Sequence, residues 1–305
     1  MININYLAGR RPHYGPITFK YIKMIREDLK DKIHMTIITP NIPYWSSHAE
    51  DLRSNGITCT LVDTGRGEDY QAKIHYAVAC DFEYSVKLDE DAFINNYVWD
   101  YMIENISVLD DHHNLVLTPL ISTGIPTNDR FVEYFFDDKY KEELFNVYKN
   151  FDLPDVWGYR YSELNPLLRN WDSKTFYDAV CNIGTHYKGI HPMRMSKEAQ
   201  MVMMRFCVAN VDKFKEQGDY SLITLDAPYL CNNLFAIKTS TWRTLILDRS
   251  LYVDSFDEVP LNKFRERHDL KFLYIDKSFG IHTAYNTVDN GHGDIEQGFT
   301  NYSLG

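Results

Sequence analysis

Three consecutive acidic residues, Asp89, Glu90 and Asp91, follow a short apolar segment that begins at Tyr84. Neighbouring carboxylates repel one another, so they need open solvent or a cation. A hard divalent ion such as manganese or magnesium binds oxygen ligands and keeps coordination positions open for water and substrate phosphates. The plainer alternative is a solvated turn in which Asp89 or Asp91 caps the next helix. Because the acids end a hydrophobic strand of a predicted α/β sheet, where ligands bind, we predict a metal site.

Two groups in the last third of the chain have side chains suited to the same chemistry. Asp257 and Glu258 precede an amphipathic helix, and a carboxylate there either caps the helix or acts as a general base toward an acceptor hydroxyl. Their position alone does not separate these roles. His282 follows a predicted strand. A lone histidine is more often structural than a ligand, but imidazole is a good third ligand for manganese beside two carboxylates.

Three cationic side chains are predicted to lie near the same strand ends. Arg10 and Arg11 follow the first strand, and Lys73 lies in the helix before the acids. The chain has neither a P-loop nor a Gly-x-Gly-x-x-Gly fingerprint. A phosphate-bearing ligand would therefore need a metal and cationic side chains. For each of the three cations, an ordinary surface charge is at least as strong an interpretation.

The spacing of apolar residues predicts the elements that position these groups. Strands are expected at residues 2–8, 33–39, 57–62 and 84–89, and helices at residues 17–29, 46–54 and 70–80. This alternation predicts an α/β fold with a parallel sheet and right-handed crossovers. Farther along, helices are expected near residues 96–107 and after Ser196, strands at residues 114–121, 230–237 and 272–280, and a helix capped by Thr239 or Ser240.

Residues 131–191 are rich in aromatic side chains and match no simple pattern. Such rings suit a platform for stacking a sugar or a base, because each has a flat apolar face and a polar edge. We expect most of them to belong to the core and one or two to touch a ligand.

The composition predicts a cytoplasmic globular protein. Of the 305 residues, 44% are hydrophobic and 25% charged, which is ordinary for a soluble domain. Neither a membrane span nor a signal peptide is expected. The five scattered cysteines predict reduced thiols and no disulfides. The net charge of −11 opposes broad, sequence-independent binding of nucleic acid.

In their order along the chain, these features resemble the GT-A class of nucleotide-sugar glycosyltransferases. The resemblance rests on the Asp-x-Asp segment Val86–Asp91, the later strand Asn233–Lys238, the acidic helix start Asp257–Glu258 and the late His282. It implies a Rossmann-like nucleotide-binding half joined to an acceptor-binding half around one mixed, mostly parallel sheet. The halves would be residues 1–125 and 126–285, followed by a polar tail at 286–305.

The resemblance also implies roles for individual residues. Asp89 and Asp91 would bind a divalent metal, manganese preferred and magnesium possible, with His282 as the third ligand. Asp257 or Glu258 would act on the acceptor, as the base if the enzyme inverts. The nucleotide-sugar donor, UDP-linked or similar, would contact a set of residues near the first strand and the acids: Ala8, Gly9, Arg10, Arg11, Asp63, Lys73, Asp89 and Glu90.

The expected activity is therefore transfer of a hexose or pentose to an acceptor hydroxyl on a saccharide or protein. A hydroxymethylated base in viral or phage DNA is an alternative acceptor, which would place the protein in the host cytoplasm. The acidic helix start reads Phe-Asp-Glu where the class usually has x-Glu-Asp, so the identity of the base stays open. Two alternatives to a glycosyltransferase are a non-catalytic nucleotide-sugar binding module and a sugar-phosphate nucleotidyltransferase of related fold.

Overall fold

Alternating apolar side chains place the first strands between two hydrophobic cores. In β1 (Ile2–Leu7) the Tyr6 side chain enters one core and Leu7 the other, and Ile37 and Ile38 divide in the same way in β2 (Ile33–Thr39). A strand with both faces covered is typical of a parallel sheet between helical layers. The computed structural model describes residues 1–9, 11–65, 70–153, 155, 160–166, 191–225, 229–251 and 258–283.

The described strands form one sheet in the order β3-β2-β1-β4-β8-β6-β9-β5, with β7 paired to β9. From β3 (Thr58–Asp63) to β4 (Tyr84–Asp89) all neighbours are parallel. β8 (Leu234–Lys238) runs antiparallel between β4 and β6 (Asn114–Ile121), and β9 (Lys271–His282) is parallel to β6. β5 (Ala92–Phe93) and β7 (Ser221–Thr224) pair antiparallel with β9. The predicted α/β class with a mixed, mostly parallel sheet is confirmed.

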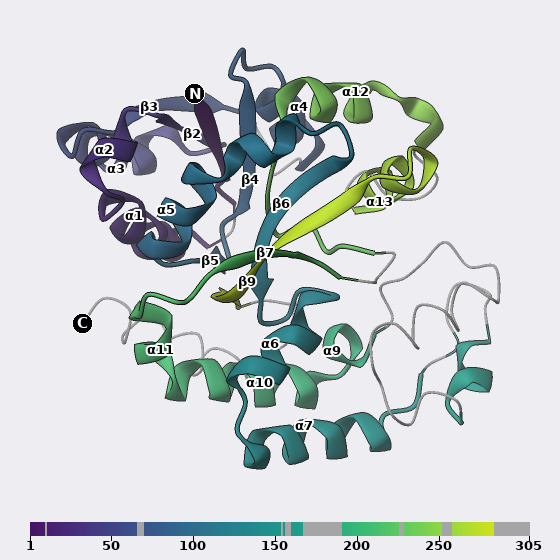
Figure 1. The fold of residues 1–305 in the computed structure, drawn as a ribbon. Helices are drawn as coiled ribbons and strands as arrows, with labels where there is room; N and C mark the ends of the chain where they lie inside the picture. The colour runs from purple at the N-terminus through teal and green to yellow at the C-terminus, as the bar shows by residue number, and fades with distance from the viewer. Residues whose placement is uncertain are drawn as a thin grey trace.

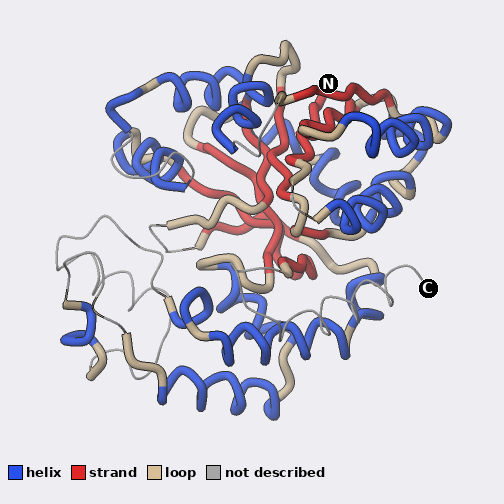
Figure 2. The backbone as a smooth tube through the Cα atoms, turned by 180° about the vertical axis from the view of Figure 1, so that it is seen from behind, coloured by secondary structure: helices blue, strands red, loops and turns tan. Residues whose placement is uncertain are grey.

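Helices cover both faces of this sheet and one of its ends (Figures 1 and 2). One face packs against α1 (Gly15–Lys23), α3 (Ile42–Ser54) and α5 (Asn96–Glu104). The other packs against α4 (Tyr70–Val78), α12 (Thr239–Leu247) and α13 (Glu258–Arg267). A third group lies beyond the end of β6: α6 (Thr127–Phe135), α7 (Asp138–Asn150), α9 (Pro192–Met195), α10 (Lys197–Ala209) and α11 (Val211–Lys215).

The remaining described elements are short: α2 (Glu27–Lys30) and the 3-10 helices η1 (Pro12–Tyr14), η2 (Ile106–Asp110), η3 (Tyr161–Leu164) and η4 (Arg249–Leu251). Among the described helices, none combines the length and apolar character needed to cross a bilayer. Four of the five cysteines lie in described parts of the chain, and all four are free thiols, as expected.

Several element boundaries and one helix cap differ from the sequence-based predictions. The helix expected over residues 17–29 ends at Lys23, and α2 follows separately. The strand expected from residue 230 begins only at Leu234, because the preceding backbone is bonded to side chains of other elements. Neither Thr239 nor Ser240 caps α12, which has Lys238 at its N-cap without a side-chain bond. The Thr239 hydroxyl instead pairs with Ser85 in β4 at 2.8 Å.

Two predictions concern regions that the structure describes only in part. Of the described aromatic residues in the segment 131–191, Phe131, Phe136 and Tyr148 are buried in the core and Phe145 is exposed. Many of the others lie outside the described residues, so the expectation that most belong to the core stays a prediction. The polar tail at 286–305 lies outside the described residues. The division of the chain near residue 125 stays a prediction, and strands from both sides of it share the sheet.

Candidate functional site

The carboxyl ends of four strands that run in the same direction meet at one edge of the sheet. β1 leads into Gly9 and Arg11, β4 into the acids, β6 into Thr123, and β9 ends at His282. This edge is where ligands bind in open α/β sheets. Residues from both ends of the sequence are therefore brought together there.

Asp91 and His282 are neighbours at this edge. Asp91 Oδ1 lies 3.3 Å from His282 Nε2, and Asp91 Oδ2 accepts a hydrogen bond from Arg11 Nη1 at 2.8 Å. Burial would raise the pKa of Asp91, but His282 and Arg11 outweigh that effect and the pKa lies below its usual value. Asp91 is thus held as a carboxylate, with an imidazole nitrogen close enough to share one cation.

The imidazole of His282 is oriented by Thr123, which follows β6. The Thr123 hydroxyl donates to the His282 carbonyl oxygen at 3.3 Å, and its oxygen lies 2.8 Å from Nδ1. These contacts fix the orientation of the ring, with Nε2 directed toward Asp91 and Asn233. A histidine fixed through its other nitrogen is the usual arrangement for a metal ligand.

Asn233 supplies a second polar group beside the imidazole. Its Nδ2 lies 3.1 Å from His282 Nε2, and its backbone oxygen accepts from the Asp89 amide at 3.0 Å. Within the described part of the chain, the buried Asn233 Oδ1 atom has no hydrogen-bond partner. A buried acceptor without a donor is costly, so this oxygen is suited to a cation, a water or a ligand group.

Asp89 has a different environment from Asp91. Both of its carboxylate oxygens accept from Lys87 Nζ, at 2.8 and 2.7 Å, and Lys87 also donates to the Asn232 carbonyl oxygen at 2.6 Å. In the described part of the chain, Asp89, Asp91 and His282 do not place one ligand atom each within 4.8 Å of the other two. The predicted three-ligand set is therefore divided: two members are adjacent, and the third is paired with an internal lysine.

Glu90 binds the backbone of the loop after β1. Its carboxylate accepts from the Gly9 amide at 2.7 Å and from the Arg11 amide at 3.1 Å. A Cβ atom at Gly9 would lie 3.0 Å from Glu90 Oε1 and 3.3 Å from Lys73 Nζ, so the loop approaches closely. Lys73 donates to the Ala8 carbonyl oxygen at 2.5 Å. Burial raises the pKa of Glu90 despite these bonds.

The other predicted site residues are more dispersed. Asp63 ends β3 and accepts from the Gly65 amide at 2.7 Å. Glu258 begins α13, and its carboxylate accepts from the Tyr229 hydroxyl. The segment from Tyr229 to Asn233 connects Glu258 to the neighbourhood of His282 along the chain. Arg10 and Asp257 lie outside the described residues.

Sequence reasoning missed Lys87, Thr123, Asn233 and Tyr6. Lys87 carried a usable signal, since a lysine two residues before Asp89 in an apolar strand points to the same face. The Tyr6 hydroxyl is buried, and burial together with Glu90 and Asp91 raises its pKa well above the usual value. The plainer alternative for the acids, in which Asp89 or Asp91 caps the next helix, is wrong: Asn95 caps α5, accepting from Val98 N at 2.9 Å.

Comparison with known proteins gives structural matches only. No protein-family model and no curated protein matches the chain. The galactosyltransferase LgtC, in complex with donor and acceptor sugar analogues, is 11% identical with a TM-score of 0.44, over 100% of this chain and 95% of its own. The mannosyltransferase PcManGT of Pyrobaculum calidifontis, in complex with GDP-Man and Mn²⁺, is 11% identical with a TM-score of 0.34, over 69% of this chain and 74% of its own.

TarS of S. aureus is a third match, 16% identical with a TM-score of 0.26 over 40% of this chain. The chain spans 20% of the length of TarS. The chain is thus similar to solved glycosyltransferase structures at low identity, and at these TM-scores the similarity does not establish a family.

Proposed function

We propose that this chain is a metal-dependent glycosyltransferase that moves a sugar from a nucleoside-diphosphate sugar to an acceptor hydroxyl. The observation that carries the proposal is the 3.3 Å approach of Asp91 and His282 at the carboxyl edge of the sheet, with Arg11 2.8 Å from Asp91. An oxygen and an imidazole donor beside a guanidinium suit a cation and a phosphate group together.

Asp91 and His282 would hold the divalent ion, with manganese preferred. The buried Asn233 oxygen fits such an occupant because it has no donor from the described residues. Asp89 would become the third ligand after its ion pair with Lys87 is broken. When bound, the ion would neutralise charge on the departing nucleoside diphosphate, a form of Lewis-acid catalysis.

The residues after β1 and β3 would position the donor. Arg11 would turn from Asp91 toward the diphosphate, and Lys73 would add a second positive charge behind the Ala8–Gly9 backbone. Asp63, at the end of β3, would accept hydrogen bonds from the nucleoside. None of these contacts needs a glycine-rich phosphate loop, which the chain lacks.

Glu258 would deprotonate the acceptor hydroxyl in an inverting reaction, with Asp257 beside it in the sequence. The Tyr229 hydroxyl holds the Glu258 carboxylate at the start of α13, which would orient it as a general base requires. We take a saccharide as the acceptor, because the net charge of −11 opposes a DNA duplex.

A release assay tests the proposal. Purified protein is incubated with a panel of nucleotide sugars, with and without Mn²⁺, and free nucleoside diphosphate is followed. We expect Mn²⁺-dependent release from one donor, reduced about 100-fold in Asp91→Asn. Asp212→Asn is the control, because its side chain is 91% exposed on α11. Metal-dependent donor binding without release would favour a binding module, and neither binding nor release would overturn the proposal.

A further inference from the structure

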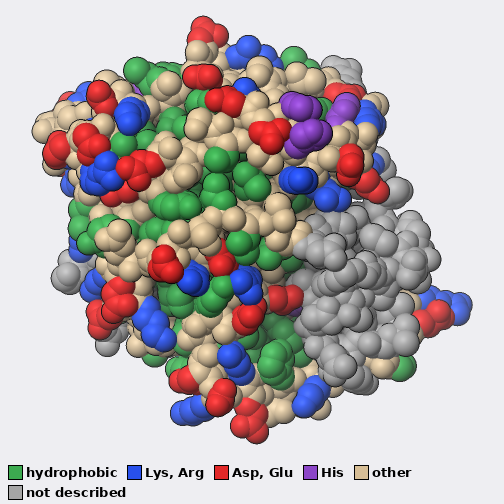
Figure 3. Space-filling model, viewed as in Figure 1, with side chains coloured by type: hydrophobic (Ala, Val, Ile, Leu, Met, Phe, Trp, Pro, Cys, Tyr) green, Lys and Arg blue, Asp and Glu red, His purple; other side chains and the backbone are tan. Residues whose placement is uncertain are grey.

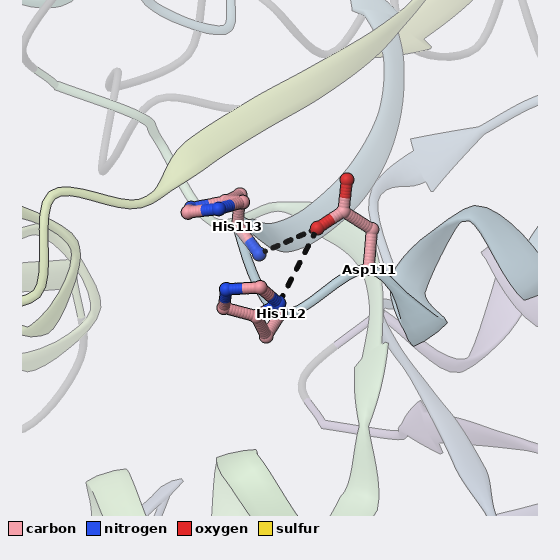
Figure 4. A group of neighbouring side chains, drawn as sticks. All are labelled: Asp111, His112 and His113. Atoms are coloured by element: carbon pink, nitrogen blue, oxygen red, sulfur yellow. Dashed lines mark hydrogen bonds and ion pairs between the residues drawn. The ribbon is translucent and has the colours of Figure 1, made fainter.

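Asp111, His112 and His113 form a second group of potential metal ligands between η2 and β6. One ligand atom from each residue lies within 4.8 Å of the other two, and Asp111 Oδ1 is 3.8 Å from His112 Nδ1 (Figure 4). The two imidazole centroids are 4.0 Å apart. All three side chains are exposed, and Figure 3 shows histidine side chains gathered beside acidic and basic ones on that face.

The backbone that carries these side chains is anchored on both sides. Asp111 Oδ1 accepts from the His113 amide at 3.0 Å, and the Asp111 carbonyl oxygen accepts from the Asn114 amide at 3.0 Å. The His113 carbonyl oxygen accepts from the Lys271 amide at 2.7 Å, where β9 begins. Binding an ion here would therefore require reorientation of side chains but little ordering of the chain.

A cavity of about 430 Å³ adjoins this group. His112 lines it, together with Asp110, Asn114 and a further imidazole from His268. His268 follows α13 and is exposed. An ion held by Asp111, His112 and His113 would therefore face a space large enough for water or a further ligand, with another nitrogen donor on its wall.

This group is separate from the Asp91–His282 edge. Asn114 begins β6, whereas Thr123, which contacts His282, comes after its end. An eight-residue strand spans roughly 25 Å. The two groups thus lie at opposite ends of the same strand, and one ion cannot be shared between them.

We propose that Asp111, His112 and His113 form a binding site for a divalent transition metal ion of the Zn²⁺ type, with open coordination positions facing the His268 cavity. Two imidazoles and one carboxylate favour Zn²⁺, Ni²⁺ or Cu²⁺ over Mg²⁺ and Mn²⁺, which prefer oxygen ligands. The site is thereby different in metal preference, as well as in position, from the edge that carries Asp91.

Equilibrium dialysis of the full chain against Zn²⁺, in an Asp91→Asn background, tests this site. We expect Zn²⁺ binding that weakens at least about tenfold in the double variant His112→Ala/His113→Ala. His75→Ala is the control, since His75 is an exposed histidine on α4 that does not belong to this group. Circular dichroism establishes that each variant is folded.

Copper EPR supplies a second readout that does not depend on activity. Cu²⁺ bound at one equivalent should show hyperfine coupling to imidazole nitrogen, lost in the double variant and kept in His75→Ala. Equal Zn²⁺ affinity in the parent and the double variant, or unchanged nitrogen coupling, would overturn the proposal. Neither readout involves release of nucleoside diphosphate. The proposed zinc site and the proposed transferase activity can therefore each be contradicted without affecting the other.

Discussion

The two ends of the central sheet both gather metal-ligand side chains, but they balance charge differently. At the carboxyl end, Asp89 is paired with Lys87 at 2.7 Å and Asp91 with Arg11 at 2.8 Å, and their side chains are mostly covered. At the other end, Asp111 stands among exposed histidines beside a cavity.

The difference suggests two modes of cation binding. A cation that arrives at the carboxyl end must displace Lys87 and Arg11, and an anionic ligand that accepts those charges makes the exchange easier. Metal and diphosphate are therefore expected to bind there together. At the opposite end no such exchange is required, so a metal should bind without an anionic partner.

The largest effect on stability is expected from Lys87→Met. Removing the lysine takes a buried cation away from Asp89 and from the Asn232 carbonyl oxygen, which should lower the free energy of unfolding by roughly 3 kcal/mol. Lys23→Met removes an exposed pair with Asp51, 2.6 Å long, and should cost less than about 1 kcal/mol. Urea unfolding measures both.

Mn²⁺ should partly restore the stability of Lys87→Met, because the Asp89 carboxylate is no longer held by the lysine and becomes available to another cation. Equal losses in the two lysine variants would contradict the idea that the carboxyl end is balanced by internal cations.

A smaller loss of stability is expected from Gly280→Ala. This variant should also affect metal binding at only one end of the sheet. A Cβ atom there would lie 2.5 Å from the Leu120 carbonyl oxygen and 2.7 Å from Ile121 Cδ1, so β9 must shift near His282 at a cost of about 1–3 kcal/mol. Mn²⁺ affinity should fall while Zn²⁺ binding at the other end is unchanged.

Gly65→Ala is the matched control. Gly65 has a φ of +76° and no atom within 4 Å of an added Cβ, so the variant carries backbone strain of about 1 kcal/mol without a steric contact. If Gly280→Ala weakened Mn²⁺ and Zn²⁺ binding equally, the two ends would not be independent.

The smallest effect concerns acid stability at the histidine end. Hydrogen bonds from Lys238, at 2.8 Å, and from the Tyr84 hydroxyl, at 2.7 Å, lower the pKa of Asp110. A carboxyl group with a lowered folded-state pKa stabilises the protein above its unfolded pKa, about 4, and this contribution is lost as the pH falls through the folded value. Urea unfolding from pH 6 to pH 3 should therefore show a shallower loss in Asp110→Asn. Parallel profiles for the two proteins would rule this contribution out.

Much of the fold could be predicted because its strands and helices have clear periodicities. Apolar residues on both faces of β1 and β2 predict buried parallel strands, and the acids after β4 mark its end. Local hydrogen bonds were harder to predict. Asn95 caps α5 in place of an acid, and Thr239 bonds across the sheet to Ser85, a partner 154 residues away.

In the candidate site, too, the residue types could be predicted from the sequence but their contacts could not. The side-chain types at Asp91 and His282 suggested a metal, but their proximity depends on strand order across 190 intervening positions. The roles of Thr123 and Asn233 depend on that order too. Lys87 shows how a site can differ from its motif: the Asp-x-Asp spacing predicts paired ligands, whereas a buried lysine on the same face takes one of them.

The most direct test of the central claim is calorimetric titration of Mn²⁺ with and without UDP. In the parent protein, UDP should tighten Mn²⁺ binding, and Mn²⁺ should tighten UDP binding by the same factor. Asp91→Asn should abolish this coupling, whereas His112→Ala/His113→Ala should keep it. Equal Mn²⁺ affinity and equal coupling in Asp91→Asn and the parent would contradict the assignment of the carboxyl end as the metal and donor site.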